Sequence, residues 1–282
     1  MKKLIATVLM AAMLLTGLVS CSNSNDNPDG SISGEITVIS REEGSGTRDA
    51  FVELFEIEEI YEVAEITEKT SVMLTSVAGN KRAIGYVSLG SISDEVKVLA
   101  VDGVNATAEN VKNGTYKVSR NFNLAYKENG LSEVAKDFLK FVLSEEGQKI
   151  VEEEGYISVD TNEKYKASGL SGKISLAGST SVGPVAEVLL EAYCELNPGV
   201  EFDVQQTGSS AGMTSTIEGA CDIGMASRNL KDSEKETLTS ATIAVDGIAV
   251  VVNVENTVEA LTSEQIKNIF TGEITDWSEI VE

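Results

Sequence analysis

The chain has 282 residues, with 45 acidic side chains against 22 Lys and Arg and a net charge of −23. It contains no His and three Cys, which excludes His-dependent catalysis, His-ligated zinc and Cys₄ metal clusters. The negative charge argues against a nucleic-acid partner, because such binding requires a basic face. A hydrophobic content of 42% is typical of a globular protein, and the length predicts about two domains or lobes.

The first 20 residues contain a long apolar run that follows Lys2 and Lys3 and ends in the sequence LVSC at Cys21. This pattern resembles a bacterial lipobox, which implies a lipoprotein signal peptide over residues 1–20, cleaved before Cys21, and a lipid on the sulfur of Cys21. An ordinary signal peptide or an uncleaved anchor is the alternative. In every case the segment directs targeting and is not part of the fold. Residues 21–33 are rich in Ser, Asn and Gly, so we expect a flexible tether.

The two remaining cysteines are Cys194, in a predicted helix, and Cys221, at the start of a predicted strand. A disulfide between them is conceivable in an exported protein. We expect instead two separate small residues of the core.

From about residue 34 the chain alternates short apolar strands with amphipathic helices, which is typical of an α/β protein. The predicted strands of this first part are Glu35–Ile39, Ala83–Leu89 and Val96–Val101. The predicted helices follow residue 47, cover Ser71–Ala78, and run from Leu131 to Glu154 as one long helix or two.

A second series of elements follows a polar stretch, residues 166–172, that we interpret as a linker. The predicted strands are Lys173–Ala177, Val200–Gln205, Asp222–Ala226 and Ala244–Asn253, and the predicted helices follow Pro184, cover Ser210–Glu218 and end at Phe270. The last helix is predicted to begin at a capping box, because Thr262 is followed three positions later by Gln265.

One local arrangement occurs three times: a strand ends in a turn of Gly, Ser and Thr, and a helix begins. The turns are Gly44-Ser45-Gly46-Thr47, Gly178-Ser179-Thr180-Ser181 and Gly208-Ser209-Ser210-Ala211-Gly212. Helix N-termini expose unpaired N–H groups, and hydroxyls donate hydrogen bonds without adding charge. Each turn alone could be an ordinary helix cap. Three such turns, one flanked by Arg41 and Arg48, predict a site for a tetrahedral oxyanion.

At these residues the chain resembles the PstS-type phosphate-binding proteins of bacterial phosphate ABC transporters. The matching stretches are Val38–Phe51, Ala83–Gly90, Ile174–Val185, Gly208–Gly212, Asp222–Leu230, Ala244–Val252 and Leu261–Trp277, and together the two parts cover nearly all of 34–282. The resemblance implies an α/β protein with the two-lobed, periplasmic-binding-protein-like (type II) fold. It also implies a ligand cleft between the lobes and closure of the lobes over phosphate.

The order of the two halves departs from the usual layout of the family. Residues 34–165 resemble the C-terminal half, residues 173–282 resemble the N-terminal half, and each occurs once. We therefore interpret the chain as a circularly permuted single protein whose former ends are joined by the linker at residues 166–172. The alternative is a piece of a tandem array, which could pair with a second copy by swapping halves.

The resemblance also implies which residues contact phosphate. The candidate ligand residues are Arg41, Ser45, Gly46, Thr47, Ser179, Thr180, Ser181, Ser209, Ser210 and Asp246. Family members commonly carry an Asp, in place of Ser227-Arg228 here, that accepts the phosphate proton and so rejects sulfate. Asp246 is the candidate substitute, and its alternative roles are a turn residue or an ion-pair partner of Arg228.

These features predict an extracytoplasmic lipoprotein, held at the cell membrane through Cys21, that captures inorganic phosphate for an ABC permease. We expect a monomer that is not an enzyme, with no cofactor, no metal and no nucleic-acid partner. A phosphate-processing P-loop enzyme is excluded, because no Lys follows the glycines of Gly44-Ser45-Gly46-Thr47. The alternatives are a sensing or adhesive surface receptor without transport, and a binder of another oxyanion such as sulfate.

Overall fold

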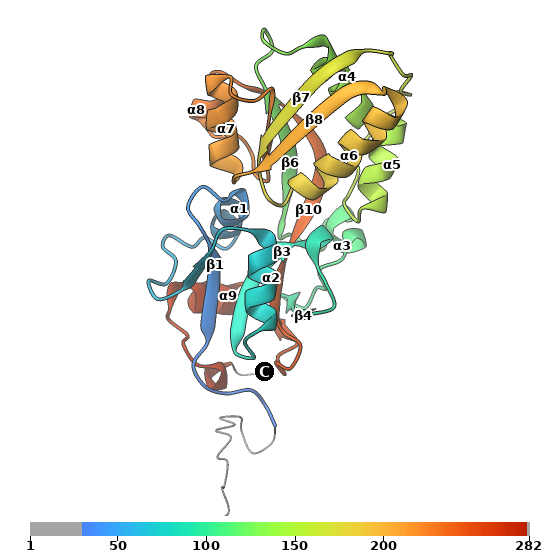
Figure 1. Cartoon of the computed structure of the whole chain (residues 1–282). Helices are drawn as coiled ribbons and strands as arrows, with labels where there is room; N and C mark the ends of the chain where they lie inside the picture. The colour runs from blue at the N-terminus through green and yellow to red at the C-terminus, as the bar shows by residue number, and fades with distance from the viewer. Residues whose placement is uncertain (1–29, 281–282) are drawn as a thin grey trace, which may run out of the picture.

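The computed structural model describes residues 30–280, so the leader, Cys21 and the start of the tether lie outside the described residues. The chain forms two α/β lobes that lie end to end with a narrow waist (Figure 1). Lobe A consists of residues 30–118 and 248–280, and lobe B of residues 119–247. The expected two-lobed fold is therefore confirmed.

Lobe A is built on a sheet in which β1 pairs in parallel with both β2 and β3. Its elements are β1 (Thr37–Arg41), α1 (Gly46–Leu54), β2 (Glu65–Thr67), α2 (Thr70–Ala78), β3 (Ala83–Ser88), η1 (Leu89–Ser91), β4 (Val96–Val98), β5 (Ala100–Val101), α3 (Ala108–Lys112), β11 (Ala260–Leu261), α9 (Ser263–Thr271) and η2 (Trp277–Glu279). Its core contains the stacked rings of Phe51 and Tyr86, with centroids 3.9 Å apart, and the edge of Phe270. These rings fix α1 against β3.

Lobe B has its own core, separate from that of lobe A. Its elements are β6 (Ser119–Tyr126), α4 (Glu133–Val142), α5 (Glu145–Glu153), β7 (Ser171–Gly178), α6 (Gly183–Leu196), β8 (Gly199–Gln206), α7 (Ser209–Glu218), β9 (Ile223–Ala226) and α8 (Asp232–Lys235). In the strand order β6-β9-β7-β8, the neighbouring strands β7 and β9 run parallel, so their C-terminal ends lie side by side. These C-terminal ends face lobe A.

A single long strand, β10 (Thr239–Asn253), belongs to both lobes. Its first half pairs with β6 in lobe B, and its second half pairs with β3 and β4 in lobe A. Nearly all of its second half is fully buried, as expected for a central strand covered on both faces. At the waist Ile248 N donates to Val118 O at 2.8 Å. Among the described residues, the chain therefore crosses between the lobes only here, along two neighbouring strands.

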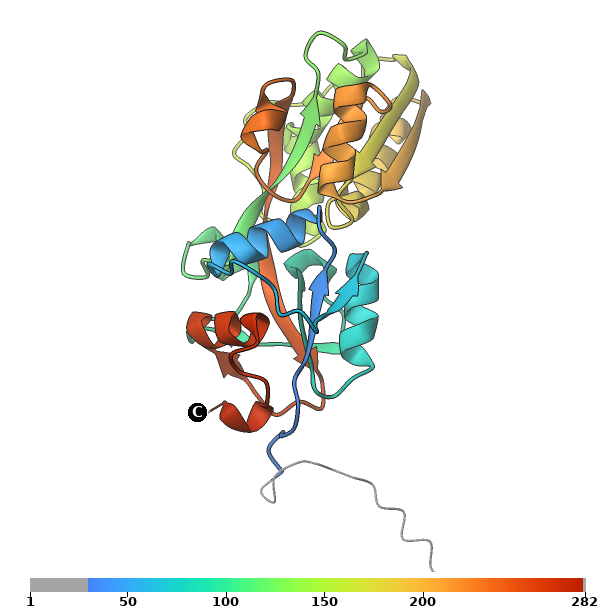
Figure 2. The same cartoon turned by 90° about the vertical axis from the view of Figure 1, so that its left-hand side faces the viewer.

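The described ends of the chain both lie in lobe A, at the end remote from lobe B (Figure 2). Ile36 N donates to Thr275 O at 2.8 Å, and Gly34 N donates to Asp276 Oδ1 at 3.1 Å. The start and the end of the described chain thus form one continuous piece of lobe A. Lobe B, in contrast, is a single uninterrupted stretch of sequence.

The predicted elements are present, with differences at their ends. The stretch Val96–Val101 forms two short strands rather than one, and Leu131–Glu154 forms two helices because Ser144 caps a new one. Strand β7 begins at Ser171, so the last two residues of the expected linker belong to the sheet. Ser171 pairs with Gly199, and this parallel pairing with β8 extends the strand beyond its apolar part.

The end of the expected tether is also ordered into lobe A. Ile32 is 3% exposed, and its N–H donates to Thr257 Oγ1 at 2.8 Å. The tether predicted for residues 21–33 thus differs from the structure at its last residues, because an apolar side chain within a polar stretch packs into the core. Cys194 and Cys221 are separate free thiols, half-buried rather than fully in the core. No helix within residues 30–280 is long and apolar enough to cross a membrane.

Candidate anion-binding site

The three Ser- and Gly-rich turns meet at the boundary between the lobes. Helix α1 of lobe A lies at the waist, directly beneath α7 of lobe B (Figures 1 and 2). Thr47 Oγ1 and Ser181 Oγ lie 3.0 Å apart, a hydrogen bond in which either hydroxyl could donate. Ser210 N donates to Gly44 O at 3.0 Å. Turns that are far apart in the sequence therefore form one cluster.

The cluster is a set of buried hydroxyl groups. Its members are Ser45, Thr47, Thr70, Thr180, Ser181, Ser209 and Ser227, each at most 6% exposed. Thr70 Oγ1 lies 3.2 Å from both Thr180 Oγ1 and Ser181 Oγ. Ser209 Oγ and Ser227 Oγ are 3.5 Å apart. Because the hydroxyls bond to one another, they could exchange those bonds for the oxygens of a bound anion without moving far.

Arg41 provides the positive charge next to these hydroxyls. It is 2% exposed, and its Nη2 donates to Thr180 Oγ1 at 3.3 Å across the lobe boundary. Glu42 accepts from its Nε and Nη2, both at 2.9 Å. The carbonyls of Thr67 and Glu68 accept from the same two nitrogens at 3.2 and 3.1 Å. These bonds fix the guanidinium in place, so that an anion would meet a donor that is already oriented.

Some polar groups of these turns bond within their own turn or helix, and others have no partner within the helix. Ser45 caps α1 by accepting from Arg48 N at 3.4 Å. Ser179 accepts from Ser181 N at 3.2 Å, so the Ser181 N–H is bonded within its own turn. Gly46 and Thr47 open α1, and N–H groups in a first helical turn have no partner within the helix. These two N–H groups sit at the positive end of the helix and suit an anion.

At Gly46 the two lobes approach each other closely. A Cβ built on Gly46 would overlap Ser209 Oγ and lie 2.7 Å from Ser227 Oγ. Only glycine therefore allows α1 and the serines of lobe B to come together.

Sequence reasoning missed Thr70 and Ser227. Thr70 opens α2, and Ser227 directly follows β9. Neither belongs to a Gly-rich turn, so the pattern that predicts the other candidate ligands does not include them. For Ser227 a signal was available, because Ser227-Arg228 stands where family members commonly carry the Asp that contacts phosphate. No comparable signal marks Thr70.

Asp246 is buried beside the cluster but is bonded elsewhere. It is 1% exposed and accepts from Ser88 Oγ at 2.9 Å and from Arg120 Nη2 and Nε at 3.1 and 3.3 Å. Its ion-pair partner is therefore Arg120 of the neighbouring strand and not Arg228. Burial raises the pKa of Asp246, and the charge of Arg120 opposes that shift. Arg120 Nη1 has no hydrogen-bond partner although it is buried.

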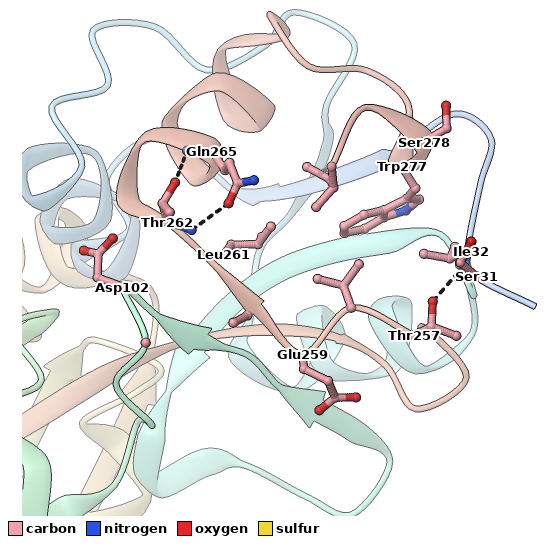
Figure 3. Close-up of a pocket in the computed structure, with 14 residues that line it drawn as sticks. Ser31, Ile32, Asp102, Thr257, Glu259, Leu261, Thr262, Gln265, Trp277 and Ser278 are labelled. Atoms are coloured by element: carbon pink, nitrogen blue, oxygen red, sulfur yellow. Dashed lines mark hydrogen bonds between the residues drawn. The ribbon is translucent and has the colours of Figure 1, made fainter. Parts of the chain in front are cut away.

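Two cavities of the described part of the chain differ in whether their linings suit an anion. A cavity of about 590 Å³ lies between Ile32, Leu261 and Trp277, near the described ends of the chain (Figure 3). Asp102 and Glu259 are in its lining, which includes no Lys or Arg, so it does not suit an anion. A cavity of about 280 Å³ opens beside the hydroxyl cluster. It is lined by residues of both lobes: Lys69, Thr70, Ser71, Leu74, Gly90, Ser91, Thr180, Pro184 and Gln206.

Comparison with known proteins gives consistent matches. A model of the PBP superfamily domain matches residues 18–146 and 164–281. The phosphate-binding protein PstS 2 of Streptococcus agalactiae is 47% identical over 290 residues, which cover 99% of this chain and 98% of that protein. PstS 2 of Streptococcus pneumoniae is 42% identical over 94% of each chain. The crystal structure of a phosphate-binding protein of a phosphate ABC transporter from S. pneumoniae TIGR4 matches with a TM-score of 0.72 and 42% identity, over 88% of this chain and 100% of that chain.

Proposed function

This chain belongs to the PstS-type phosphate-binding proteins of the PBP superfamily, and on that basis we propose that it captures inorganic phosphate outside the cytoplasm for an ABC permease. The observation that carries the proposal is the convergence of three turns from two lobes on Arg41. The donors are hydroxyls, helix N–H groups and one guanidinium. This set suits a tetrahedral oxyanion in a strongly acidic protein.

Phosphate is held between the lobes by residues from both. Lobe A contributes Arg41, Ser45, Gly46 and Thr47, and lobe B contributes Ser179, Thr180, Ser181, Ser209 and Ser210. Hydrogen bonds to a charged group contribute about 1.5–3 kcal/mol each, and micromolar affinity corresponds to about 8 kcal/mol. Several such bonds must therefore act together, which requires both lobes to close on the same anion. The acceptor role of Asp246 stays a prediction, since its carboxylate is bonded to Arg120 and Ser88.

The protein is held at the membrane by a lipid on Cys21, which lies outside the described residues. This part of the proposal is supported by the course of the described chain, which enters lobe A at its end remote from the cleft (Figure 2). A tether attached there leaves the opening between the lobes free for phosphate and for a permease.

The molecule is a monomer with the two halves of the family in permuted order. Two observations support this. The S. agalactiae relative aligns along 98% of its own length, so it carries the halves in the same order. Within this chain, the first and last described segments join in lobe A, where Ile36 N donates to Thr275 O.

Calorimetric titration of the purified protein with phosphate and with sulfate tests the proposal. We expect one phosphate per chain and much weaker binding of sulfate. No heat with phosphate would refute phosphate capture, and equal affinities would favour a general oxyanion binder. Loss of phosphate uptake on deletion of the gene would separate a transport protein from a receptor that only senses phosphate.

A further inference from the structure

Arg228 stands out among the buried charges at the lobe boundary because all five of its N–H groups are bonded. It directly follows Ser227 of the hydroxyl cluster and is 5% exposed. Its Nη1 donates to Asn229 O at 2.9 Å and to Glu234 Oε2 at 2.8 Å. Its Nη2 donates to Glu234 Oε1 at 2.8 Å and to Ser210 Oγ at 3.2 Å, and its Nε donates to Asp49 Oδ2 at 3.0 Å. No donor is left for a direct bond to an anion.

The contacts with Glu234 and Asn229 lie within lobe B, so they do not depend on how the lobes are arranged. Glu234 is 7% exposed, and its Oε2 also accepts from Lys231 N at 2.8 Å. Burial by itself would raise the pKa of Glu234, but the bonds from Arg228 and Lys231 outweigh burial and lower it. A two-pronged bond to a fixed carboxylate holds the guanidinium with its Nε directed toward lobe A.

The contact with Asp49 crosses the lobe boundary. Asp49 lies in the first turn of α1, the helix that begins at Gly46. Its side chain is 22% exposed, against 6% for that of Arg228. Lys231 Nζ lies 3.4 Å from the same oxygen of Asp49. Two cations of lobe B thus meet one carboxylate of lobe A at the rim of the site.

The contact with Ser210 connects this ion pair to the anion site. Ser210 Oγ accepts from Arg228 Nη2, while Ser210 N donates to Gly44 O of lobe A at 3.0 Å. Arg228 therefore touches a candidate phosphate ligand and a residue of the opposite lobe at the same time.

We propose that Arg228 is a positioning residue whose ion pair with Asp49 latches the closed lobes and slows the release of phosphate. This inference rests on the proposed function. Opening the lobes separates Asp49 from Arg228, while Glu234 retains the guanidinium in lobe B. The pair therefore stabilises the closed form only, and its loss acts on the rate of release rather than on the rate of capture.

The test compares Asp49→Asn with Glu53→Gln, which removes one negative charge from an exposed position of the same helix. Stopped-flow measurement of phosphate dissociation is expected to give a rate about tenfold higher for Asp49→Asn, with an association rate changed less than twofold. Salt is expected to speed release from the unmodified protein and from Glu53→Gln, but not from Asp49→Asn. Equal release rates for the two variants would overturn the latch.

Two further measurements separate the latch from a purely structural role and from the proposed function. Asp49→Glu keeps the charge and is expected to restore slow release, which a change in packing alone would not explain. Small-angle scattering of the protein without phosphate is expected to show a larger radius of gyration for Asp49→Asn than for Glu53→Gln. An equal radius together with equal release rates rejects the latch. If the unmodified protein does not bind phosphate, the proposed function is rejected instead. The comparison of the radius of gyration between Asp49→Asn and Glu53→Gln then tests the latch by itself.

Discussion

The hydroxyl oxygens of Thr47 and Ser181 lie 3.0 Å apart although the two residues are 134 positions apart in the chain and belong to different lobes. Thr47 is in the first turn of α1, and Ser181 is in the turn that leads from β7 to α6. Both side chains are at most 2% exposed. Because this contact joins the two lobes, separating them would break it, so it belongs to a conformation in which a ligand would be enclosed.

Replacing Arg41 tests the cation whose guanidinium contacts the hydroxyl cluster directly. Arg41→Ala is expected to weaken phosphate binding at least tenfold, because the charge-assisted bonds from the guanidinium are lost. Calorimetry gives the affinity, and thermal unfolding checks the fold. Arg82→Ala is the control, since Arg82 Nε bonds to Ser33 O in lobe A and lies outside the cluster. Unchanged phosphate affinity in Arg41→Ala would remove Arg41 from the site.

Replacing Gly46 tests whether the lobes must approach this closely. The added Cβ of Gly46→Ala would overlap Ser209 Oγ of the opposite lobe. Forcing extra atoms into a packed contact costs about 1–3 kcal/mol, so we expect phosphate affinity to fall about five- to a hundredfold. Gly130→Ala is the control, because a Cβ there meets nothing closer than 3.7 Å. Equal affinities for the two variants would show that closure does not bring Gly46 against Ser209.

Asp246→Asn separates the two roles available to that carboxylate. Breaking the buried pair with Arg120 leaves an uncompensated charge, so we expect the free energy of unfolding in urea to fall by about 3–5 kcal/mol. Asp203→Asn, at an exposed position, is expected to change it very little. The ratio of phosphate to sulfate affinity is measured on the same protein. If the ratio of phosphate to sulfate affinity stays the same, Asp246 does not accept the proton of bound phosphate.

The side chain of Asp137 contacts the segment that precedes β7, and the shift of its pKa predicts how acid affects the stability of the protein. Burial alone would raise its pKa, but bonds from Tyr165, Ser168 and Tyr193, at 2.6, 2.7 and 2.9 Å, lower it below its usual value of 3.8. A lowered pKa in the folded state stabilises the protein above about pH 3.8, and that stability is lost as the pH falls through the lower value.

Urea unfolding at a series of pH values checks this prediction. We expect Asp137→Asn to be less stable than the unmodified protein at pH 6 and to lose less stability on acidification. Glu163→Gln, an exposed position in the same region, is the control for a change of charge alone. Parallel pH curves for Asp137→Asn and the unmodified protein would contradict the prediction.

The sequence was sufficient to predict most of the longer elements, because apolar periodicity marks strands and helices, and it also predicted that the three turns meet. It did not predict β6, the strand that pairs with the first half of β10. It was also sufficient for the capping box of Thr262 and Gln265, which the structure confirms. Thr70 and Ser227 escaped because a hydroxyl without a neighbouring Gly resembles any other Ser or Thr at the end of an element.

The partner of Asp246 could not be predicted, because it depends on the register between β10 and β6. That register shifts between Thr242 and Ala244, and only after this irregularity does Asp246 lie opposite Arg120. The burial of Ile32 was missed for a related reason. Its partners come from the far end of the chain, and local composition carries no information on such a contact.

Because lobe B is one uninterrupted stretch that joins the rest of the molecule at two adjacent strand positions, a single genetic exchange can replace it whole. Such a recombination would substitute the turns at Thr180, Ser209 and Ser227 together while leaving Arg41 and Gly46 untouched. Chimeras between relatives of this layout therefore offer a direct route to new anion preferences, with each parent supplying one wall of the binding site.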